Sequence, residues 1–398
     1  MGVWGRLLGT PQDRFAAEAL RIARRTPGVL AARYDQEAFA IAMRRPDSSA
    51  PTWFFLGNAF GECQGMNRAQ RRRHLERLIH IMTTSAPPQG WEAIREQLRP
   101  VLRPVTFGQA GPPGMTPPIS RPAMPFLREF VVVDMPDSMA YIVPDRAAEW
   151  GVTIDDIFTA ARANLAILAQ RTLRRPWDAD AIIRMIDTGD GYFTSLLLAE
   201  GWLEAVSERM GVPAVVFVPD VNNVLVCGRK GAIAGFYDLV EKEYAEAVRG
   251  ISPVAYVAAG DGRVVPYRPD PDDPDFVAAR RAEVVLAAKE YGAQTEWLRG
   301  QYEKAGIDVF VAGLLAGAAE GSPAITVATW TDGVPSLLPE AQFIAFQRDA
   351  ETGPMVPWEI AAELTGLTAE PLLAPARYRV EGWPAPDVMD ALRLHDVG

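Results

Sequence analysis

Proline is the residue that most limits what this chain can fold into, because eight prolines fall between Pro100 and Pro125. A proline has no backbone N–H and a fixed φ, so neither a helix nor a central strand can run through such a stretch. Apolar residues such as Val101 and Phe107 indicate that this extended connector lies against a domain surface. A second interruption, YRPDPDDPDF over residues 267–276, is acidic and rich in proline. We therefore predict an N-terminal unit over 1–104, a connector over 105–126, a central unit over 127–255, a linker over 256–275 and a C-terminal unit over 276–398.

The central unit mixes helical and strand periodicity. Residues 130–143 read as two strands about a turn at 136–138, and residues 214–227 read as a hairpin over the turn sequence PDVNN. The short hairpin loop makes its strands antiparallel, which disfavours a doubly wound parallel sheet. We therefore predict an α+β fold, with antiparallel or mixed sheets and helices packed on one face. The other elements of this unit are helices over 154–169, 193–210 and 232–248 and a strand over 181–186.

The two flanking units also read as α+β. In the N-terminal unit, we expect helices over 14–25 and 68–82 and strands over 29–35, 38–44 and 52–56. In the C-terminal unit, we expect a helix over 277–304, a short helix over 358–364, and strands at DVFVAGLL, AITVATW, AQFIAFQ and ARYRVEGW.

Composition excludes several classes of protein. The chain is 48% hydrophobic and 23% charged, close to the average for globular proteins, so a sizeable core can form. No run approaches the roughly 18 apolar residues of a membrane span, and the first residues are too polar for a signal peptide. The two cysteines, Cys63 and Cys227, offer no disulfide framework. We therefore expect a cytoplasmic protein with no membrane partner.

The sequence also lacks the usual signatures of metal and cofactor sites. Its three histidines are His74, His80 and His395, and the first two are six residues apart on a predicted helix, so they face different sides. No GxSxG nucleophile turn and no GxxxxGK[ST] phosphate loop occurs. We expect no metal site and no cofactor.

Charge is distributed unevenly along the chain. Residues 1–104 hold 16 arginines, no lysine and 9 acidic residues, whereas the remainder holds 24 basic and 41 acidic residues. A basic N-terminal unit can mark a nucleic-acid-binding arm, or it can pack on an acidic body. The net charge of −10 argues against binding of phosphate backbones by the protein as a whole.

Several segments resemble the YtpQ-like family, a bacterial group without an assigned function. They are LRPVLRP, FVVVDMPDSMAYIV, ARANL, DTGDGYFTS and VVFVPDVNNVLVCG, together with FLGNAF ahead of a basic helix. The resemblance covers about residues 10–255 and agrees with an α+β scaffold. The family has no established catalytic residues that could be assigned to positions here. The C-terminal unit looks like an extension, and the resemblance attaches no activity to it.

Asn164 is a polar residue on an apolar helix face. Ile157, Ala161 and Leu168 stand seven and three residues before it and four residues after it, so they share its face. A buried amide without partners costs about 1–3 kcal/mol, so this side chain must find them. We expect Asn164 either to tie down a neighbouring loop or strand edge, or to line a ligand pocket.

The turn DTGDGYFTS gathers carboxylates and hydroxyls where a strand stops and a helix begins. Asp190 or Thr194 can cap that helix, which is the structural interpretation. Such a turn is also a common place for a polar or metal-dependent site. The candidate catalytic residues are then Asp187, Asp190 and Ser195, with Tyr192 as a candidate binding residue. Asp134, Asp137 and Asp220 join this site if the strand ends converge.

Two basic elements are candidate anion-binding sites. Arg71, Arg72 and Arg73 lie on the predicted helix over 68–82, where such a cluster is usually a solvated face. The loop Gly228–Gly231, with Arg229 and Lys230, follows a strand and precedes a helix, so its backbone N–H groups could hold a phosphate. An ordinary strand-to-helix turn with exposed basic side chains fits this loop better.

The residues support three functional interpretations. The first, which the sequence favours, is a non-enzymatic protein- or peptide-binding adaptor with another protein as its partner. It fits the several β-rich units, the large apolar faces and the lack of a recognisable nucleophile. The second is a carboxylate- or metal-dependent hydrolase centred on Asp187 and Asp190. The third is nucleotide or nucleic-acid binding through Arg71–Arg73 and Gly228–Gly231.

Overall fold

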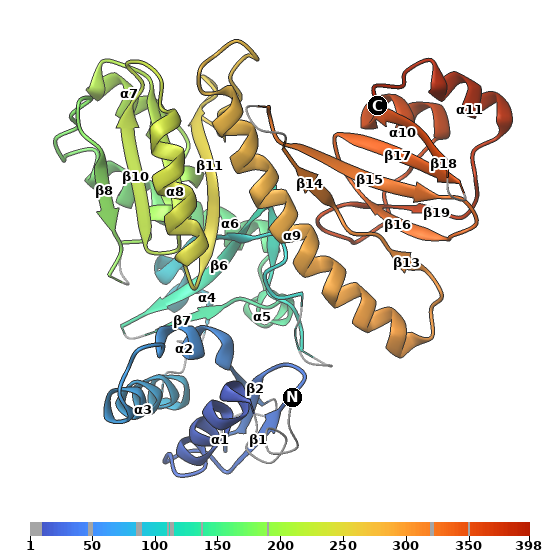
Figure 1. The fold of residues 1–398 in the computed structure, drawn as a ribbon. Coiled ribbons are helices and arrows are strands. Elements are labelled where there is room, and N and C mark those ends of the chain that lie inside the picture. The colour runs from blue at the N-terminus through green and yellow to red at the C-terminus, as the bar shows by residue number, and fades with distance from the viewer. Residues whose placement is uncertain are drawn as a thin grey trace.

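The structure is a computed structural model. Helices and antiparallel and mixed sheets follow one another along the chain, so the predicted α+β fold is confirmed. Figure 1 shows the N-terminal unit in blue at one end of the molecule and the C-terminal unit in orange and red beside the central sheets. Among the helices in the described part of the chain, none combines the length and the apolarity needed to span a bilayer. The described residues are 10–46, 51–84, 90–109, 111, 115–136, 138–188, 191–318, 322–348 and 351–398.

The N-terminal unit is an antiparallel sheet of order β1-β2-β3 with helices packed against it. The first helix begins at a capping box, in which the hydroxyl of Thr10 accepts a hydrogen bond from the backbone N–H of Asp13 at 3.0 Å. Phe15, Leu75 and Ile79 are buried between the helices and the sheet, as the helical periodicity of the sequence predicts. The elements are α1 (Pro11–Ala23), β1 (Ala31–Asp35), β2 (Ala40–Arg44), β3 (Thr52–Phe55), α2 (Leu56–Glu62) and α3 (Arg68–Thr84).

The proline-rich stretch contributes two edge strands to a second sheet, of order β4-β6-β5, in which β7 also pairs with β6. All three prolines of these strands, Pro100, Pro104 and Pro122, lie in β4 or β5, while the central strand β6 has none. This agrees with the confinement of proline to edge strands, because a central strand needs every backbone donor. The elements are α4 (Trp91–Ile94), η2 (Arg95–Gln97), β4 (Leu98–Pro104), β5 (Ser120–Met124), β6 (Leu127–Met135) and β7 (Ser138–Tyr141).

The third sheet has the order β12-β11-β9-β10-β8, and the predicted hairpin is its β9–β10 pair. Strand β11 is not among the predicted strands, and its last residues fall in the predicted linker over 256–275. Its apolar run is interrupted by Pro253. The structure accommodates Pro253 at a register shift between Ser252 and Ala255, where β11 does not pair regularly with β9. The strands are β8 (Ile183–Ile186), β9 (Ala214–Asp220), β10 (Asn223–Gly228), β11 (Gly250–Ala258) and β12 (Val264–Pro266).

The predicted helix over 193–210 is wrong as a single element. It is divided into the 3-10 helix η3 (Phe193–Leu198) and the helix α7 (Trp202–Met210). Gly201 lies between them with φ of 71°, a left-handed conformation that ends one element and starts the next. The other helices around the central sheets are α5 (Pro144–Trp150), α6 (Ile154–Thr172) and α8 (Ala234–Glu246).

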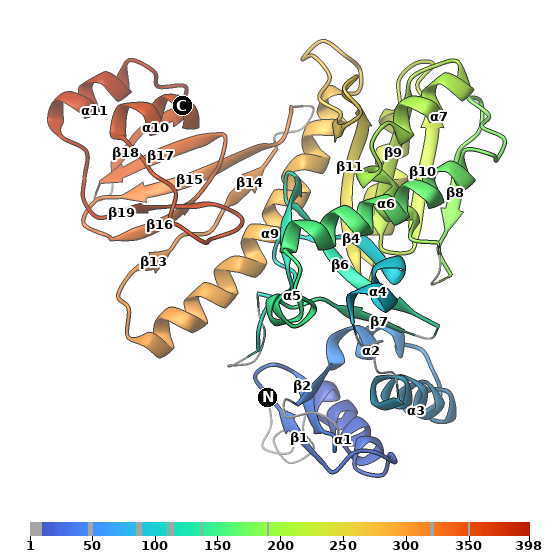
Figure 2. The same cartoon turned by 180° about the vertical axis from the view of Figure 1, so that it is seen from behind.

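The long helix α9 (Phe276–Ala305) lies between the central sheets and the C-terminal unit in both views (Figures 1 and 2). Its first half packs on β11, and its later part contacts β13, β14 and β15. The C-terminal unit contains two sheets of order β13-β16-β19 and β14-β15-β17-β18, each with one parallel pair. Its elements are β13 (Phe310–Val311), β14 (Leu315–Gly317), β15 (Ile325–Thr331), β16 (Ser336–Pro339), β17 (Phe343–Arg348), β18 (Glu351–Pro357), α10 (Trp358–Thr365), β19 (Arg377–Val380) and α11 (Pro386–Arg393).

Candidate functional site

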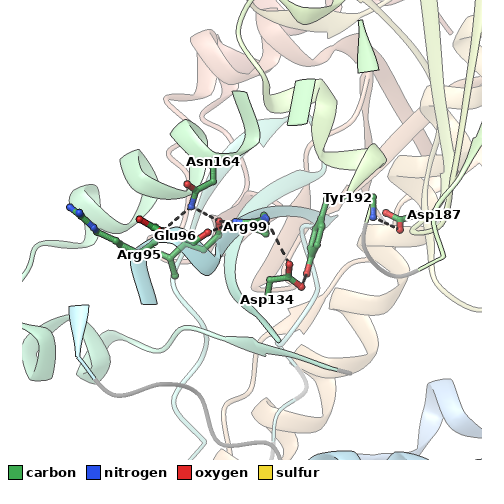
Figure 3. A network of polar contacts seen from close by, with 9 residues as sticks. Arg95, Glu96, Arg99, Asp134, Asn164, Asp187 and Tyr192 are labelled. Atoms are coloured by element: carbon green, nitrogen blue, oxygen red, sulfur yellow. Dashed lines mark hydrogen bonds and ion pairs between the residues drawn. The ribbon is translucent and has the colours of Figure 1, made fainter. Parts of the chain in front are cut away.

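Tyr192 and Asp134 form a polar pair at the junction of the two central sheets (Figure 3). The Tyr192 hydroxyl donates to Asp134 Oδ1 at 2.7 Å, and Arg99 Nε lies 3.8 Å from Asp134 Oδ2. Burial, and then the hydrogen bond to Asp134, raise the pKa of Tyr192 far above its usual value, so the hydroxyl stays a donor. Val101, Phe130 and Val132 pack around the ring. Tyr192 also has φ of 47°, a costly conformation for a residue with a side chain.

Asp187 uses both carboxylate oxygens to hold the turn that follows it. Its Oδ1 accepts from the Gly191 backbone N–H at 2.9 Å, and its Oδ2 accepts from that of Phe193 at 3.2 Å. Phe193 is the first residue of η3, so Asp187 accepts a hydrogen bond at the start of this helix. The sequence predicted this capping role for Asp190 or Thr194. Asp190 and Asp137 lie outside the described residues.

Ser195 is fully buried, and within the described chain its hydroxyl has no hydrogen-bond partner. A serine nucleophile needs a base within hydrogen-bond reach, and this hydroxyl has none there. Asp220 accepts from the backbone N–H of Asn222 inside the β9–β10 turn, at 2.9 Å. Within the described ranges, no group of three or more His, Cys, Asp or Glu side chains is arranged to hold a metal ion.

Asn164 acts as a tether between α6 and the start of β4. Its Nδ2 donates to the carbonyl oxygens of Arg95 at 2.8 Å and Leu98 at 2.9 Å. Figure 3 shows that Arg99 lies between Asn164 and the Tyr192–Asp134 pair. Arg99 Nη1 donates to the Leu98 carbonyl at 2.9 Å, the same oxygen that accepts from Asn164, and Arg99 Nε faces Asp134. The structure therefore joins Asn164, Asp134 and Tyr192 through Arg99, whereas Asp187 binds the backbone of its own turn.

The basic residues of α3 are engaged within the N-terminal unit or directed to solvent. Arg71 pairs with Glu18 of α1 at 2.9 Å, and Arg72 pairs with Glu76 one turn along at 2.8 Å. Arg73 is exposed. One side of α3 is therefore joined to α1 through Arg71, and the other side is exposed to solvent.

The loop Gly228–Gly231 is a strand-to-helix turn, as the sequence predicts, between β10 and α8. Its two cations already have partners. The Arg229 guanidinium lies 3.5 Å from Asp273 and over the ring of Tyr267, and Lys230 pairs with Asp180. At the opposite end of β10, the backbone N–H of Val221 donates to the Arg249 carbonyl at 3.1 Å, and the Arg249 guanidinium lies 3.9 Å from Glu62 of the N-terminal unit. The two basic elements therefore do not form one surface.

A cleft of about 390 Å³ lies where the central sheets, α9 and the C-terminal unit meet. Its size is within the range of ligand sites. Both proline-rich segments line the cleft: the connector supplies Val105 and Phe126, and the linker supplies Arg268. Strand β11 supplies Val254 and Tyr256, and α9, β15, the 340–342 turn and the segment before β19 complete the walls.

The walls of the cleft are mainly apolar and aromatic. Phe126 has φ of 62° and meets the ring of Tyr291 edge-on, with 5.7 Å between ring centroids. Residues held in this left-handed region cost about 1–3 kcal/mol and cluster at ligand clamps. Val284 and Ala287 of α9 lie between Tyr291 and the start of the helix. An apolar wall of this kind is suited to apolar side chains of a ligand.

Charged groups lie at the two ends of the α9 wall. Glu283 accepts from Arg268 Nε at 2.8 Å and also pairs with Arg280, so two guanidinium groups share one carboxylate. The side chain of Arg268 is 67% exposed and that of Arg280 25%, so both face solvent while making these bonds. Glu340, on the C-terminal side, is exposed, and its backbone N–H donates to the Tyr291 hydroxyl at 3.1 Å.

No local sequence pattern points to this cleft. Its lining residues come from segments between residues 105 and 376, and most are ordinary apolar residues that any core would contain. The available signal was indirect: apolar residues in the connector predicted that it lies against a domain surface. Comparison with protein-family models, with curated proteins and with solved structures finds no match to this chain.

Proposed function

We propose that this protein binds a peptide segment of another protein in the cleft between α9, β11 and the C-terminal unit. The observation that carries the proposal is the cleft itself: an apolar wall at the junction of the units, with charged groups at its ends. Ligand sites are generally concave and mostly apolar, and a few polar groups fix orientation.

We propose that the segment binds in an extended conformation. The cleft offers about 390 Å³. An extended chain presents its side chains alternately to the two sides, so one set can enter the cleft while the other faces water.

Filling the cleft tests the proposal. Ala287 is half-buried on α9 and lines the cleft. Random twelve-residue peptides displayed on phage would be selected on the full chain, and the selected sequences would be synthesised with acetyl and amide caps. For Ala287→Trp, we expect fluorescence anisotropy to show at least a tenfold loss of affinity, about 1.4 kcal/mol.

Val285→Trp is the matched control, because Val285 is 37% exposed on the same helix and is not among the residues that line the cleft. Its affinity for the selected peptides should equal that of the wild type, and both variants should keep the wild-type melting temperature within a few degrees. The proposal is wrong if no peptide is selected, or if the selected peptides bind Ala287→Trp as well as they bind the wild type.

A further inference from the structure

The α9 wall of the cleft has a positive and a negative end. Arg280, Glu283, Val284, Ala287 and Tyr291 follow one another at helical spacing, so they lie on one face of α9. Two arginines and one glutamate at the Arg280 end give that end a surplus of one positive charge. At the other end, Glu340, bonded through its backbone to Tyr291, supplies an exposed negative charge, while the neighbouring cation Arg377 is fully buried behind the Tyr291 ring.

The distance between these ends follows from helix geometry. Arg280 and Tyr291 are 11 residues apart on α9, which at 1.5 Å per residue is roughly 16 Å. An extended chain advances roughly 3.3 Å per residue, so four or five residues cover the same length. Val284 and Ala287 occupy the interval with small apolar side chains.

Both ends keep free capacity for a ligand. A guanidinium group has five N–H donors, and Glu283 engages Arg268 through Nε and Arg280 through Nη1. Both arginines line the cleft, and their side chains are 67% and 25% exposed. Among the described residues, the Glu340 carboxylate accepts one hydrogen bond, from the Tyr378 hydroxyl to Oε2 at 3.1 Å. A carboxylate can accept several, so this group can also meet a cation.

From this polarity we infer that the partner segment carries an acidic and a basic side chain four or five residues apart, separated by apolar residues. The acidic side chain lies at Arg268 and Arg280, and the basic side chain lies at Glu340. This inference rests on the proposed function and adds to it the charge pattern and spacing of the segment.

A charge exchange tests the inference with the full chain. The probe set is an eight-residue fluorescent peptide of valine, alanine and leucine, capped at both ends, with one glutamate and one lysine placed two, four, five or seven positions apart. We expect the four- and five-position peptides to bind tightest. Glu340→Lys should lower the affinity for these peptides about two- to fivefold, the range of exposed ion pairs. Replacing the peptide lysine by glutamate should then restore the affinity for the variant.

Glu363→Lys is the matched control, because Glu363 is exposed on α10 and does not line the cleft. It should leave all affinities unchanged. If the peptides bind in an Ala287→Trp-sensitive way but Glu340→Lys and the lysine-to-glutamate exchange have no effect, the charge pattern is wrong and peptide binding stands. If no capped peptide, from this set or from the phage selection, binds the cleft, the proposed function itself fails.

Discussion

At the scale of single residues, Tyr192 shows how a polar residue in a suggestive turn can serve the fold. Its ring is buried and its hydroxyl donates to Asp134. A hydrogen bond to a charged acceptor contributes about 1.5–3 kcal/mol, more than a neutral one. This bond joins the turn before η3 to the end of β6, and so holds the two central sheets together at that point.

Removing that hydroxyl should weaken the fold without affecting the cleft. We expect Tyr192→Phe to lower the free energy of unfolding by about 1–2 kcal/mol, measured by urea denaturation, since Asp134 is partly solvated and water can replace the lost donor. Affinity for cleft-binding peptides should stay at the wild-type value.

A double-mutant cycle provides the control. Adding Asp134→Ala to Tyr192→Phe should cost much less than Asp134→Ala costs in the wild type, because the shared bond is already lost. Fully additive losses would show that the pair contributes no coupling energy.

At the scale of elements, Arg377 fixes β19 to α9. Its side chain is fully buried and donates to Gln294 at 2.6 Å, to Thr295 at 2.6 Å and to the carbonyls of Ala312 at 2.7 Å and Leu337 at 3.1 Å. Burial lowers the pKa of Arg377 to about 10, which leaves it charged near neutral pH. One side chain thus ties a helix, a loop and two strands together.

Loss of this guanidinium should release the C-terminal unit from α9. Arg377→Met removes the donors of several buried acceptors, and unpaired buried acceptors cost about 1–3 kcal/mol each. We expect a loss of about 3–5 kcal/mol in the free energy of unfolding and faster hydrogen exchange over residues 377–380.

Arg379→Met is the matched control on the same strand. Arg379 is exposed and its side chain pairs with Glu381 at 2.9 Å, so the change should stay within about 0.5 kcal/mol. Equal effects of the two substitutions would contradict the anchoring role of Arg377.

The same elements show what the sequence could predict. Long periodic segments such as α9 and the β9–β10 hairpin were predicted almost to their ends, because their apolar spacing is unambiguous. Strand β11 was missed because Pro253 argues against a strand, and only the register shift beside it makes the strand possible. The sequence also does not distinguish Arg377 from Arg379, because the burial of Arg377 depends on tertiary contacts.

At the scale of the whole molecule, the connector and α9 are joined by a buried carboxylate. Glu290 is 2% exposed, and its Oε2 accepts from the backbone N–H of Thr106 at 3.2 Å and from its hydroxyl at 2.7 Å. The neighbouring residues Val105 and Tyr291 line the cleft. This contact links residues 184 apart in sequence, so no local pattern could have predicted it. The walls of the cleft arise from such long-range contacts, which explains why the site was found only in the structure.

Glu290 also makes stability depend on pH in a definite direction. Burial raises the pKa of Glu290, and the hydrogen bonds from Thr106 only partly offset this. A carboxyl whose pKa is higher in the folded than in the unfolded state binds its proton more tightly when folded. Its contribution to stability is therefore fully present below the unfolded-state pKa and is lost as pH rises through the folded-state pKa.

Glu290→Gln isolates that contribution, because the amide oxygen can still accept from Thr106 but carries no charge. We expect the free energy of unfolding of the variant, relative to that of the wild type, to increase as pH rises from 4 to 7. Urea denaturation at each pH measures both values, and their difference should be smallest at pH 4. Glu363→Gln, at an exposed position on α10, corrects for the general effect of removing one negative charge. If the stability advantage of Glu290→Gln over the wild type were largest at pH 4, the ionised Glu290 carboxylate would be more stable in the folded protein than in the unfolded chain. In that case the hydrogen bonds from Thr106, together with the charge of Lys289, would outweigh the cost of burying the carboxylate.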